Sequence, residues 1–415
     1  MPCWVPMTEL VPVEAHLERV LSAVKPLGVY SQPLLEAFGV PVAEDITAPI
    51  PLPAFDNSAM DGYAVVFRDV ADAREDAPIH LPVVGEIGAG QARLVAMSPG
   101  TAVKIMTGAP IPQGCTAVVP YEWTDRGVAT VRINRAPVEG QHIRPQGEDV
   151  QVGDVLVSAG TVLGPRHVGL LAGVGLAGVK ARARPRVVVM STGSELRDPG
   201  VPLGHDSIYD ANSWMLAAAV RAAGGIAYRV GTVSDDPAAF KEALADQLVR
   251  ADIVVTSGGV SQGDYDVVKE VLADSSDGWG TVWFGDVAMQ PGKPQGFGVI
   301  GDDDTAIFTL PGNPVSAYVS FQVFVLPAIR KMQGRTPHAR PLRDARLTHG
   351  LSSPPGKQQF VRATYDASLA TPVGGHGSHL IGDLASANAL IVVPEHVTRL
   401  APGDTVQVML LDEEF

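Results

Sequence analysis

The sequence contains little cysteine, has no long apolar run and shows no sign of a secretion signal. Two Cys in 415 residues exclude a disulfide framework and indicate a reducing compartment. The N-terminal segment carries Glu9, Glu14 and Glu18 in place of the basic start and apolar core of a signal peptide. The most apolar stretch, Val168–Val179, is too short to span a membrane. We therefore expect a soluble, cytoplasmic protein with no membrane association.

Positive charge is also scarce, because 31 Lys and Arg face 45 Asp and Glu, for a net charge of −14. Proteins that bind nucleic acid usually present an excess of Lys and Arg, so nucleic acid is excluded as the main partner. The chain has no Walker loop and no His/Cys cluster at zinc-binding spacing. An anionic substrate would need backbone N–H groups, helix N-termini, a few local cations or a bridging metal.

The length of the chain predicts several domains, and the hydrophobic pattern changes three times along it. Apolar residues at helical spacing predict a first helix that ends near Pro26. Short β-rich runs between turns then predict an all-β unit, with strands at 63–67, 81–87, 102–106, 117–121 and 129–133. A short helix follows near 165–172. After residue 334 the strands are again short and alternating, which predicts a terminal β domain with strands at 360–365, 389–393 and 405–410.

Between these β regions, continuous apolar strands alternate with helices. The strands are expected at 187–190, 226–230, 253–256 and 306–310, and the helices at 212–223, 236–250 and 314–330. This alternation predicts a parallel α/β sheet that helices cover on both faces.

Three glycine-containing loops leave the ends of these strands, where ligands of open parallel sheets bind. Glycine allows backbone N–H groups to approach an anion closely, and a following helix adds its positive end. The loops therefore predict an anion or nucleotide site. Its candidate binding residues are Thr192, Gly193, Ser257, Gly258, Gly259, Ser261, Pro311, Gly312 and Asn313.

Acidic residues lie beside the same loops. Glu195, Asp235, Asp264 and Asp266 would repel a phosphate unless a hard cation bridges them, which predicts Mg²⁺. Asp236 precedes a proline at the start of a helix, and the ordinary interpretation is a helix N-cap.

Three further residues are candidate oxyanion ligands. Lys293 stands between Gly292 and Pro294, whose fixed backbone would present it rigidly. Arg362 lies on a predicted strand, and Ser378 lies in a turn that offers a hydroxyl donor.

Two further motif matches occur in a sequence context that does not suit the function they usually indicate. Gly173–Gly178 fits the dinucleotide-binding pattern, but it follows a helix and precedes a strand, which is the reverse of the required order. Gly259–Gly263 fits the nucleophile elbow of hydrolases, yet Ser261 comes several residues after the strand that ends at Thr256. A serine hydrolase remains an alternative.

Six sequence blocks resemble the signatures of one family, the molybdopterin molybdenumtransferases, which include the bacterial MoeA proteins and the E domain of gephyrin. The blocks are Phe55–Ala64, Ile105–Pro110, Ser191–Leu196, Thr256–Gly263, Pro291–Pro294 and Leu310–Ser316. The resemblance extends from near residue 10 to near residue 412, and the combination of blocks is highly specific.

The resemblance implies a multidomain α/β plus β fold in four parts. It implies a split, elongated N-terminal domain at 1–47 and 140–184 and an inserted β domain at 48–139. A central molybdopterin-binding α/β domain at 185–333 and a C-terminal β-barrel at 334–415 complete the chain. The implied enzyme takes adenylylated molybdopterin, molybdate and Mg²⁺ and releases molybdenum cofactor and AMP. The implied assembly is a homodimer whose active site is shared between subunits, with the molybdopterin adenylyltransferase as a candidate partner.

The resemblance also implies roles for single residues. Asp61, Thr107, Glu195, Asp235 and Asp266 are the implied catalytic residues. Glu195 and Asp266 would bind Mg²⁺, with Asp264 competing for that role. Asp61 and Thr107, from the second subunit, would orient the pterin or an attacking water. Lys293, Arg362 and Ser378 would form the molybdate pocket, because cations and a hydroxyl suit a tetrahedral dianion.

One departure from the family pattern concerns this pocket. Many family members have Lys where Gln290 stands, so the affinity for molybdate and the choice between molybdate and tungstate stay open. Two other functions remain as alternatives. One is a scaffold protein on the same fold, and the other is an adenylyltransferase that catalyses the preceding step.

Overall fold

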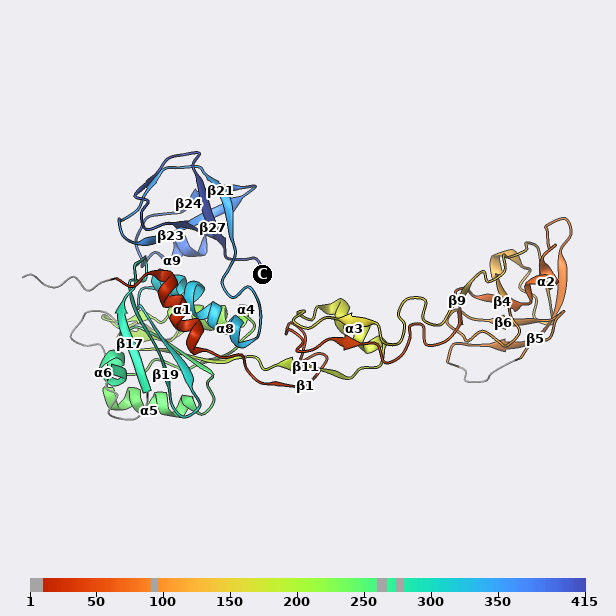
Figure 1. The fold of residues 1–415 in the computed structure, drawn as a ribbon, viewed down its shortest axis with the longest axis horizontal. Helices are drawn as coiled ribbons and strands as arrows, with labels where there is room; N and C mark the ends of the chain where they lie inside the picture. The colour runs from red at the N-terminus through yellow and green to blue at the C-terminus, as the bar shows by residue number, and fades with distance from the viewer. Residues whose placement is uncertain (1–9, 91–95, 260–266, 274–279) are drawn as a thin grey trace, which may run out of the picture. The chain divides into compact units, whose positions relative to one another are not determined.

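The computed structural model describes residues 10–90, 96–259, 267–273 and 280–415 (Figure 1). The chain divides into two compact units. One contains the chain up to Tyr30, Gly39–Pro41 and Ala181–Phe415, and the other contains Ser31–Phe38 and Val42–Lys180. Among the helices of the described ranges, none has both the length and the apolar character needed to cross a membrane.

A six-stranded sheet forms the centre of the first unit. Its strand order is β15 (Ile226–Arg229), β12 (Arg186–Ser191), β16 (Ile253–Ser257), β20 (Thr305–Leu310), β19 (Pro294–Ile300) and β17 (Gly280–Asp286). The first four strands are parallel, as the sequence predicts. The other two strands, β19 and β17, add an antiparallel edge that the apolar pattern does not predict.

Helices cover both faces of this sheet, which confirms the predicted α/β layers (Figure 1). On one face lie α1 (Val13–Ala23), α4 (Asn212–Ala222), α7 (Pro314–Ser320) and α8 (Leu326–Met332). On the other lie α5 (Pro237–Leu248) and α6 (Val267–Ala273). Val187 and Val189 of β12 enter the first hydrophobic cluster, whereas Val188 and Met190 enter the second. This alternation explains why every one of these side chains is apolar.

The predicted helix 314–330 is not a single α-helix, because a π-helical turn, Phe321–Val325, separates α7 from α8. Pro327 lies in the first turn of α8. Proline has no N–H to donate, so one regular α-helical hydrogen bond is lost at Pro327. The π-helical turn, which is wider than an α-helical turn, lies directly before α8.

The segment 1–47, predicted to be one part of a split domain, contributes to both units. Helix α1 packs on α8, β19 and the π-helical turn of the first unit. In the second unit, β2 (Ile46–Thr47) pairs with β10 (Val155–Val157), close to α3 (Pro165–Gly173). The exact domain boundaries stay a prediction.

The C-terminal region is a closed five-stranded barrel, as predicted. Its strands are β23 (Gln358–Asp366), β24 (Leu369–Pro372), β21 (Leu342–Leu347), β27 (Thr405–Leu410) and β25 (Ala389–Val393), which pairs again with β23. β18 (Met289–Gln290), from the α/β region, pairs with β23. This pairing brings the segment before Lys293 next to the barrel.

The second unit holds the predicted inserted β region as a five-stranded sheet. Its order is β7 (Ala117–Pro120), β4 (Gly62–Val65), β6 (Ala102–Ile105), β5 (Ile79–Ile87) and β8 (Thr130–Ile133). The dinucleotide-like motif starts at the end of α3 and ends at β11 (Gly178–Arg182). It therefore lies in the helix-to-strand context that excludes a dinucleotide fingerprint.

Candidate active site

The carboxyl ends of β12, β16 and β20 open into a cavity of about 500 Å³. The three glycine-containing loops meet at this rim, as the sequence predicts for one edge of a parallel sheet. Among the predicted site residues, those that line the cavity are Thr192, Gly193, Glu195, Asp235, Ser257, Gly258, Gly259, Gly312 and Asn313.

Two glycines allow the first two loops to approach each other. Gly258 and Gly259 have φ angles of +97° and +68°, which favour glycine. A Cβ on Gly258 would lie 2.9 Å from the carbonyl oxygen of Thr192. The buried Oγ1 of Thr192 has no hydrogen-bond partner within the described part of the chain. The contact therefore leaves an unused polar group in the cavity wall.

Two carboxylates lie at the first loop: Glu195 belongs to it, and Asp235 contacts it. Glu195 folds back over Gly193, where an added Cβ would lie 2.7 Å from Glu195 Oε2. Asp235 accepts a hydrogen bond from the backbone N–H of Ser194, with an N···Oδ2 distance of 2.8 Å. The rim thus carries two acidic side chains beside the glycine loops. Ser261, Asp264 and Asp266 lie outside the described residues.

Asp236 caps helix α5 and does not line the cavity. Its Oδ1 accepts a hydrogen bond from Ala239 N at 2.9 Å, and Pro237 occupies the first turn. The N-cap interpretation of Asp236 is confirmed.

Asn212 and Asp210 line the same cavity but are not predicted from the sequence. The Asn212 amide donates to Ser257 Oγ at 2.8 Å and to Gly312 O at 2.6 Å, so it joins two of the three loops. The buried Asp210 carboxylate accepts from Ser191 Oγ at 3.1 Å and from Ser213 N at 3.0 Å. From the sequence alone, Asp210 and Asn212 indicate only the start of a helix, because most of their hydrogen-bond partners are far away along the chain.

A second cavity, of about 340 Å³, adjoins the first and shares Gly258, Gly259, Gly312 and Asn313 with it. Its lining adds the predicted Pro311, Lys293 and Ser378, together with Gln290. The C-terminal region, through Ser378, and the α/β region, through Lys293, therefore both line this cavity.

The backbone around Lys293 is fixed, as predicted. Gly292 has a φ angle of +100°, and an added Cβ there would lie 2.8 Å from Ser320 Oγ. The buried Gln295 amide donates to Gly292 O at 2.6 Å. The Lys293 ammonium lies 2.7 Å from Asp286 Oδ2, so its charge already has one partner. Its other N–H donors have no ion-pair partner among the residues that the structure describes.

Arg362 lines neither cavity and is only 4% exposed. It donates to Gly377 O at 3.0 Å and to Gly375 O, and it lies 4.0 Å from Asp383 Oδ2. Burial lowers the pKa of Arg362, and Asp383 partly offsets this shift. Arg362 thus orders the loop that leads to Ser378. Direct binding of an oxyanion by Arg362 stays a prediction. The hydrogen bonds from its guanidinium to Gly375 and Gly377 do not favour it.

Asp61 and Thr107 form a hydrogen-bonded pair in the second unit. Thr107 donates to Asp61 Oδ1 from its backbone N at 2.7 Å and from Oγ1 at 2.8 Å. These two bonds, the backbone one first, lower the pKa of Asp61. The strands β4 and β6 pair antiparallel, with Gly62 opposite Ile105, so both residues lie at one end of the sheet.

Together, the sheet, the inserted β region and the barrel define a multidomain α/β protein with a cavity at the carboxyl ends of its parallel strands. Comparison with known families is more specific. Residues 11–175 match the MoeA N-terminal region (domain I and II), residues 188–331 a "Probable molybdopterin binding domain", and residues 344–411 the MoeA C-terminal region (domain IV).

Full-length relatives agree with these matches. Molybdopterin molybdenumtransferase 2 of Mycobacterium tuberculosis is 46% identical over 95% of this chain and 98% of its own length. Molybdopterin molybdenumtransferase of Bacillus subtilis is 37% identical over 90% of this chain and 87% of its own. A crystal structure of the molybdopterin biosynthesis MoeA protein from Pyrococcus horikoshii covers 98% of this chain and 100% of that chain. It superposes with a TM-score of 0.80 at 33% identity. The chain belongs to the molybdopterin molybdenumtransferase family.

Proposed function

We propose that this chain inserts molybdate into adenylylated molybdopterin, with Mg²⁺, and releases AMP and molybdenum cofactor. The observation that carries the proposal is the junction of two cavities that share Gly258, Gly259, Gly312 and Asn313. One has the glycine loops and carboxylates expected for a nucleotide, and the other has a fixed lysine expected for an oxyanion. A substrate that spans both would place its phosphoanhydride beside the carboxylates.

The residues at the rim fit a hard cation in their chemistry. Glu195 and Asp235 both line the first cavity and offer carboxylate oxygens, the ligands that Mg²⁺ prefers. We propose Glu195 as a ligand together with Asp264 or Asp266, which lie outside the described residues. Bound Mg²⁺ would neutralise negative charge at the phosphoanhydride. Asp235 holds the loop that carries Glu195 through a hydrogen bond from Ser194 N.

The second cavity is the proposed molybdate pocket. Lys293 and Ser378 line it, and Gln290 lines it where many family members have Lys. Asp286 anchors the Lys293 ammonium, whose other N–H donors have no ion-pair partner in the described ranges and would face the oxyanion. Arg362 acts as a positioning residue, through the carbonyls of Gly375 and Gly377. Because Gln290 is neutral, Lys293 carries most of the attraction for a dianion.

Asp61 and Thr107 have a proposed role in a homodimer. We propose that the Asp61–Thr107 pair of one copy completes the site of another, where an ionised Asp61 orients the pterin or a water. The hydrogen bonds from Thr107 support this role, because they keep the exposed carboxylate ionised and in one orientation. A cytoplasmic location, and hand-over of substrate from an adenylyltransferase, belong to the same proposal.

The proposal is tested by supplying the full-length chain with adenylylated molybdopterin, molybdate and Mg²⁺. We expect AMP release together with cofactor that activates an apo-molybdoenzyme. Adenylylation of molybdopterin by ATP, without insertion, would assign the chain to the preceding step. No turnover with retained substrate binding would favour a scaffold role.

A further inference from the structure

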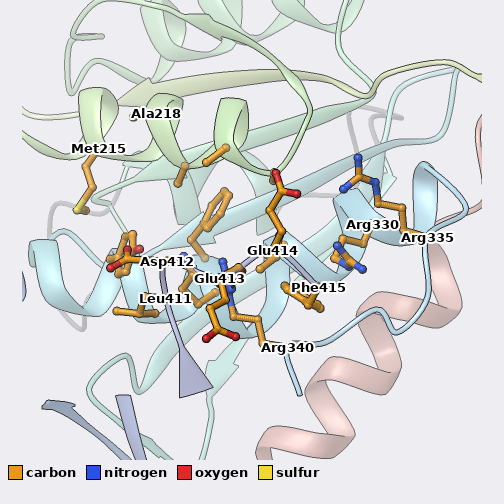
Figure 2. A pocket seen from close by; sticks show the side chains of 17 residues that line it. Met215, Ala218, Arg330, Arg335, Arg340, Leu411, Asp412, Glu413, Glu414 and Phe415 are labelled. Atoms are coloured by element: carbon orange, nitrogen blue, oxygen red, sulfur yellow. Dashed lines mark hydrogen bonds between the residues drawn. The ribbon is translucent and has the colours of Figure 1, made fainter. Parts of the chain in front are cut away.

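The first unit has a third cavity, which shares no lining residue with the two cavities of the proposed active site. Its volume, about 620 Å³, exceeds that of either. One wall is helix α4, and the opposite wall combines the segment 318–330 with Arg335, Arg340 and residues 411–415 (Figure 2). The proposed reaction leaves this cavity without a role.

Three arginines line the cavity, and among the described residues one of them, Arg340, makes three hydrogen bonds through Nε and Nη1. Arg340 donates to Gln322 Oε1 at 2.9 Å, to Leu410 O at 3.0 Å and to Glu413 O at 2.8 Å, so it anchors the C-terminal segment.

Arg330 and Arg335 retain unused donors. Arg330 is 4% exposed, and its Nε donates to Pro337 O at 2.9 Å. Neither Nη of Arg330 has a hydrogen bond to any residue that the structure describes. Arg335 donates from Nη2 to Gly39 O, whereas its buried Nε has no partner in the described ranges.

The arginines also lack a close counter-charge. Within the described residues, none of the three guanidinium groups lies within 4.0 Å of a carboxylate oxygen, and Glu413 pairs with Arg343 instead. Burial, followed by the charges of Arg335 and Arg340, lowers the pKa of Arg330 to about 10. At neutral pH the group therefore stays protonated although it is buried, and an anion in the cavity would offset that unfavourable charge.

The remaining surfaces of the cavity suit a flat apolar group. The ring of Phe415 already stacks on Arg330 and Arg340, with distances of 3.8 Å and 4.9 Å from the guanidinium carbons to the ring centroid. On the facing wall, α4 presents the small side chains of Ala218 and Ala222 toward the cavity. An aromatic body would contact these methyl groups while its oxyanion group reaches the arginines.

We propose that this cavity binds an aromatic oxyanion, with the oxyanion on Arg330 and Arg335 and the ring between α4 and Phe415. The exposed Glu414 lies in the lining, and its charge acts on Arg335. The Glu414 carboxylate would therefore compete with the oxyanion of the ligand for Arg335 and weaken its binding. The inference does not depend on the proposed function, because it uses no residue of the active site.

Calorimetric titration of the full chain with phenyl phosphate tests the proposal, with inorganic phosphate and phenol as partial ligands. We expect phenyl phosphate to bind at least about tenfold more tightly than either part, because both the guanidinium edges and the apolar wall contribute. Arg335→Gln should weaken binding about tenfold or more, since one charge-assisted hydrogen bond is lost. Glu414→Gln, an exposed change that leaves packing intact, should strengthen it.

Two controls separate this site from other sources of binding. Arg399→Gln, on an exposed strand of the barrel region, should leave the affinity unchanged. Lys293→Ala should also leave it unchanged, because Lys293 lines a different cavity. Loss of binding in Lys293→Ala would assign the ligand to the active site and overturn the proposal. Unchanged affinity in both Arg335→Gln and Glu414→Gln would overturn it as well.

Discussion

At the scale of single residues, the proposed site depends on side chains whose neighbours the structure fixes. Lys293 is the clearest case, because its backbone is held by Gly292 and Gln295 and its ammonium by Asp286. Arg362 is the contrasting case, because both of its Nη groups donate to carbonyls of its own barrel region, although its buried Nε has no partner among the described residues. Of the two cations expected at the pocket, the contacts favour only Lys293 as a direct ligand.

We predict that Lys293→Ala raises the apparent KM for molybdate about tenfold or more, because a charge-assisted contact to a dianion is lost. Lys293→Arg should retain part of the affinity. Steady-state AMP release at varied molybdate gives the measurement. The substitution also leaves Asp286 without its partner. The double variant Lys293→Ala/Asp286→Asn should therefore remain impaired, and recovery in it would show that the unpaired Asp286, not a lost ligand, caused the defect.

His16 provides a pH test of helix α1. Its ring packs among Trp283, Phe297 and Phe324, and its Nδ1 is buried without a partner in the described ranges. Burial, with a smaller contribution from Arg19, lowers the pKa of His16 from 6.5 to about 3. The unfolded chain therefore binds a proton at His16 below pH 6.5, where the folded chain does not.

The stabilisation from neutral His16 is thus complete above pH 6.5 and is lost as the pH falls toward 3. This group contributes a slope of up to about 1.4 kcal/mol per pH unit to the free energy of unfolding. We predict that His16→Phe removes this part of the pH dependence in urea unfolding between pH 7 and 5. His396→Gln, at an exposed histidine, should not. Equal slopes in wild type and His16→Phe would contradict the burial of a neutral ring.

At the scale of elements, the strand ends and the turns between them position the site. The four parallel strands could be predicted because both of their faces are buried, which requires continuous apolar runs such as Val187–Met190. The antiparallel edge could not be predicted in this way. Its strand β19 contains Gly296 and Gly298, whose missing side chains leave room for Thr309 and Val282 of the neighbouring strands.

The same contrast holds for the site. The glycine loops could be predicted because turn residues after buried strands are a local signal. Asn212 and Asp210 could not be, since their roles depend on contacts with Ser257, Gly312 and Ser191, which lie far apart in sequence. Local patterns identify where the chain turns, whereas the partners of a polar side chain depend on the tertiary structure.

Gly258 tests the close approach of the first two loops. We predict that Gly258→Ala destabilises the fold by about 1–3 kcal/mol, because it combines a positive φ angle with a contact to Thr192. AMP affinity should fall too. Gly231→Ala is the matched control, because Gly231 has no neighbour within 4 Å of an added Cβ. Urea unfolding and calorimetry measure both effects, and equal stabilities of the two variants would contradict the contact.

At the scale of the whole molecule, the two units carry different parts of the proposed machinery. Glu195 and Lys293 belong to the first unit, and Asp61 and Thr107 to the second. We propose that one active site combines these parts from two copies of the chain. A site shared between two copies can be distinguished by experiment from a site that is complete within one chain.

We predict that inactive Asp61→Ala and Glu195→Ala copies regain activity when they are unfolded together and refolded. In a mixed dimer, one of the two sites receives an intact Glu195 from one copy and an intact Asp61 from the other. Random pairing gives about a quarter of the wild-type rate of AMP release. Each variant refolded alone is the control. If the site is complete within one chain, the mixture stays inactive.

We propose that the nucleotide part of the substrate binds where the loops after β12, β16 and β20 meet. A crystal structure of the chain with AMP tests it most directly. We expect the phosphate of AMP against the backbone of Gly193 and Gly258, beside Glu195, with the Lys293 cavity open next to it. AMP bound away from these loops, or Lys293 separated from them by other side chains, would contradict this binding mode.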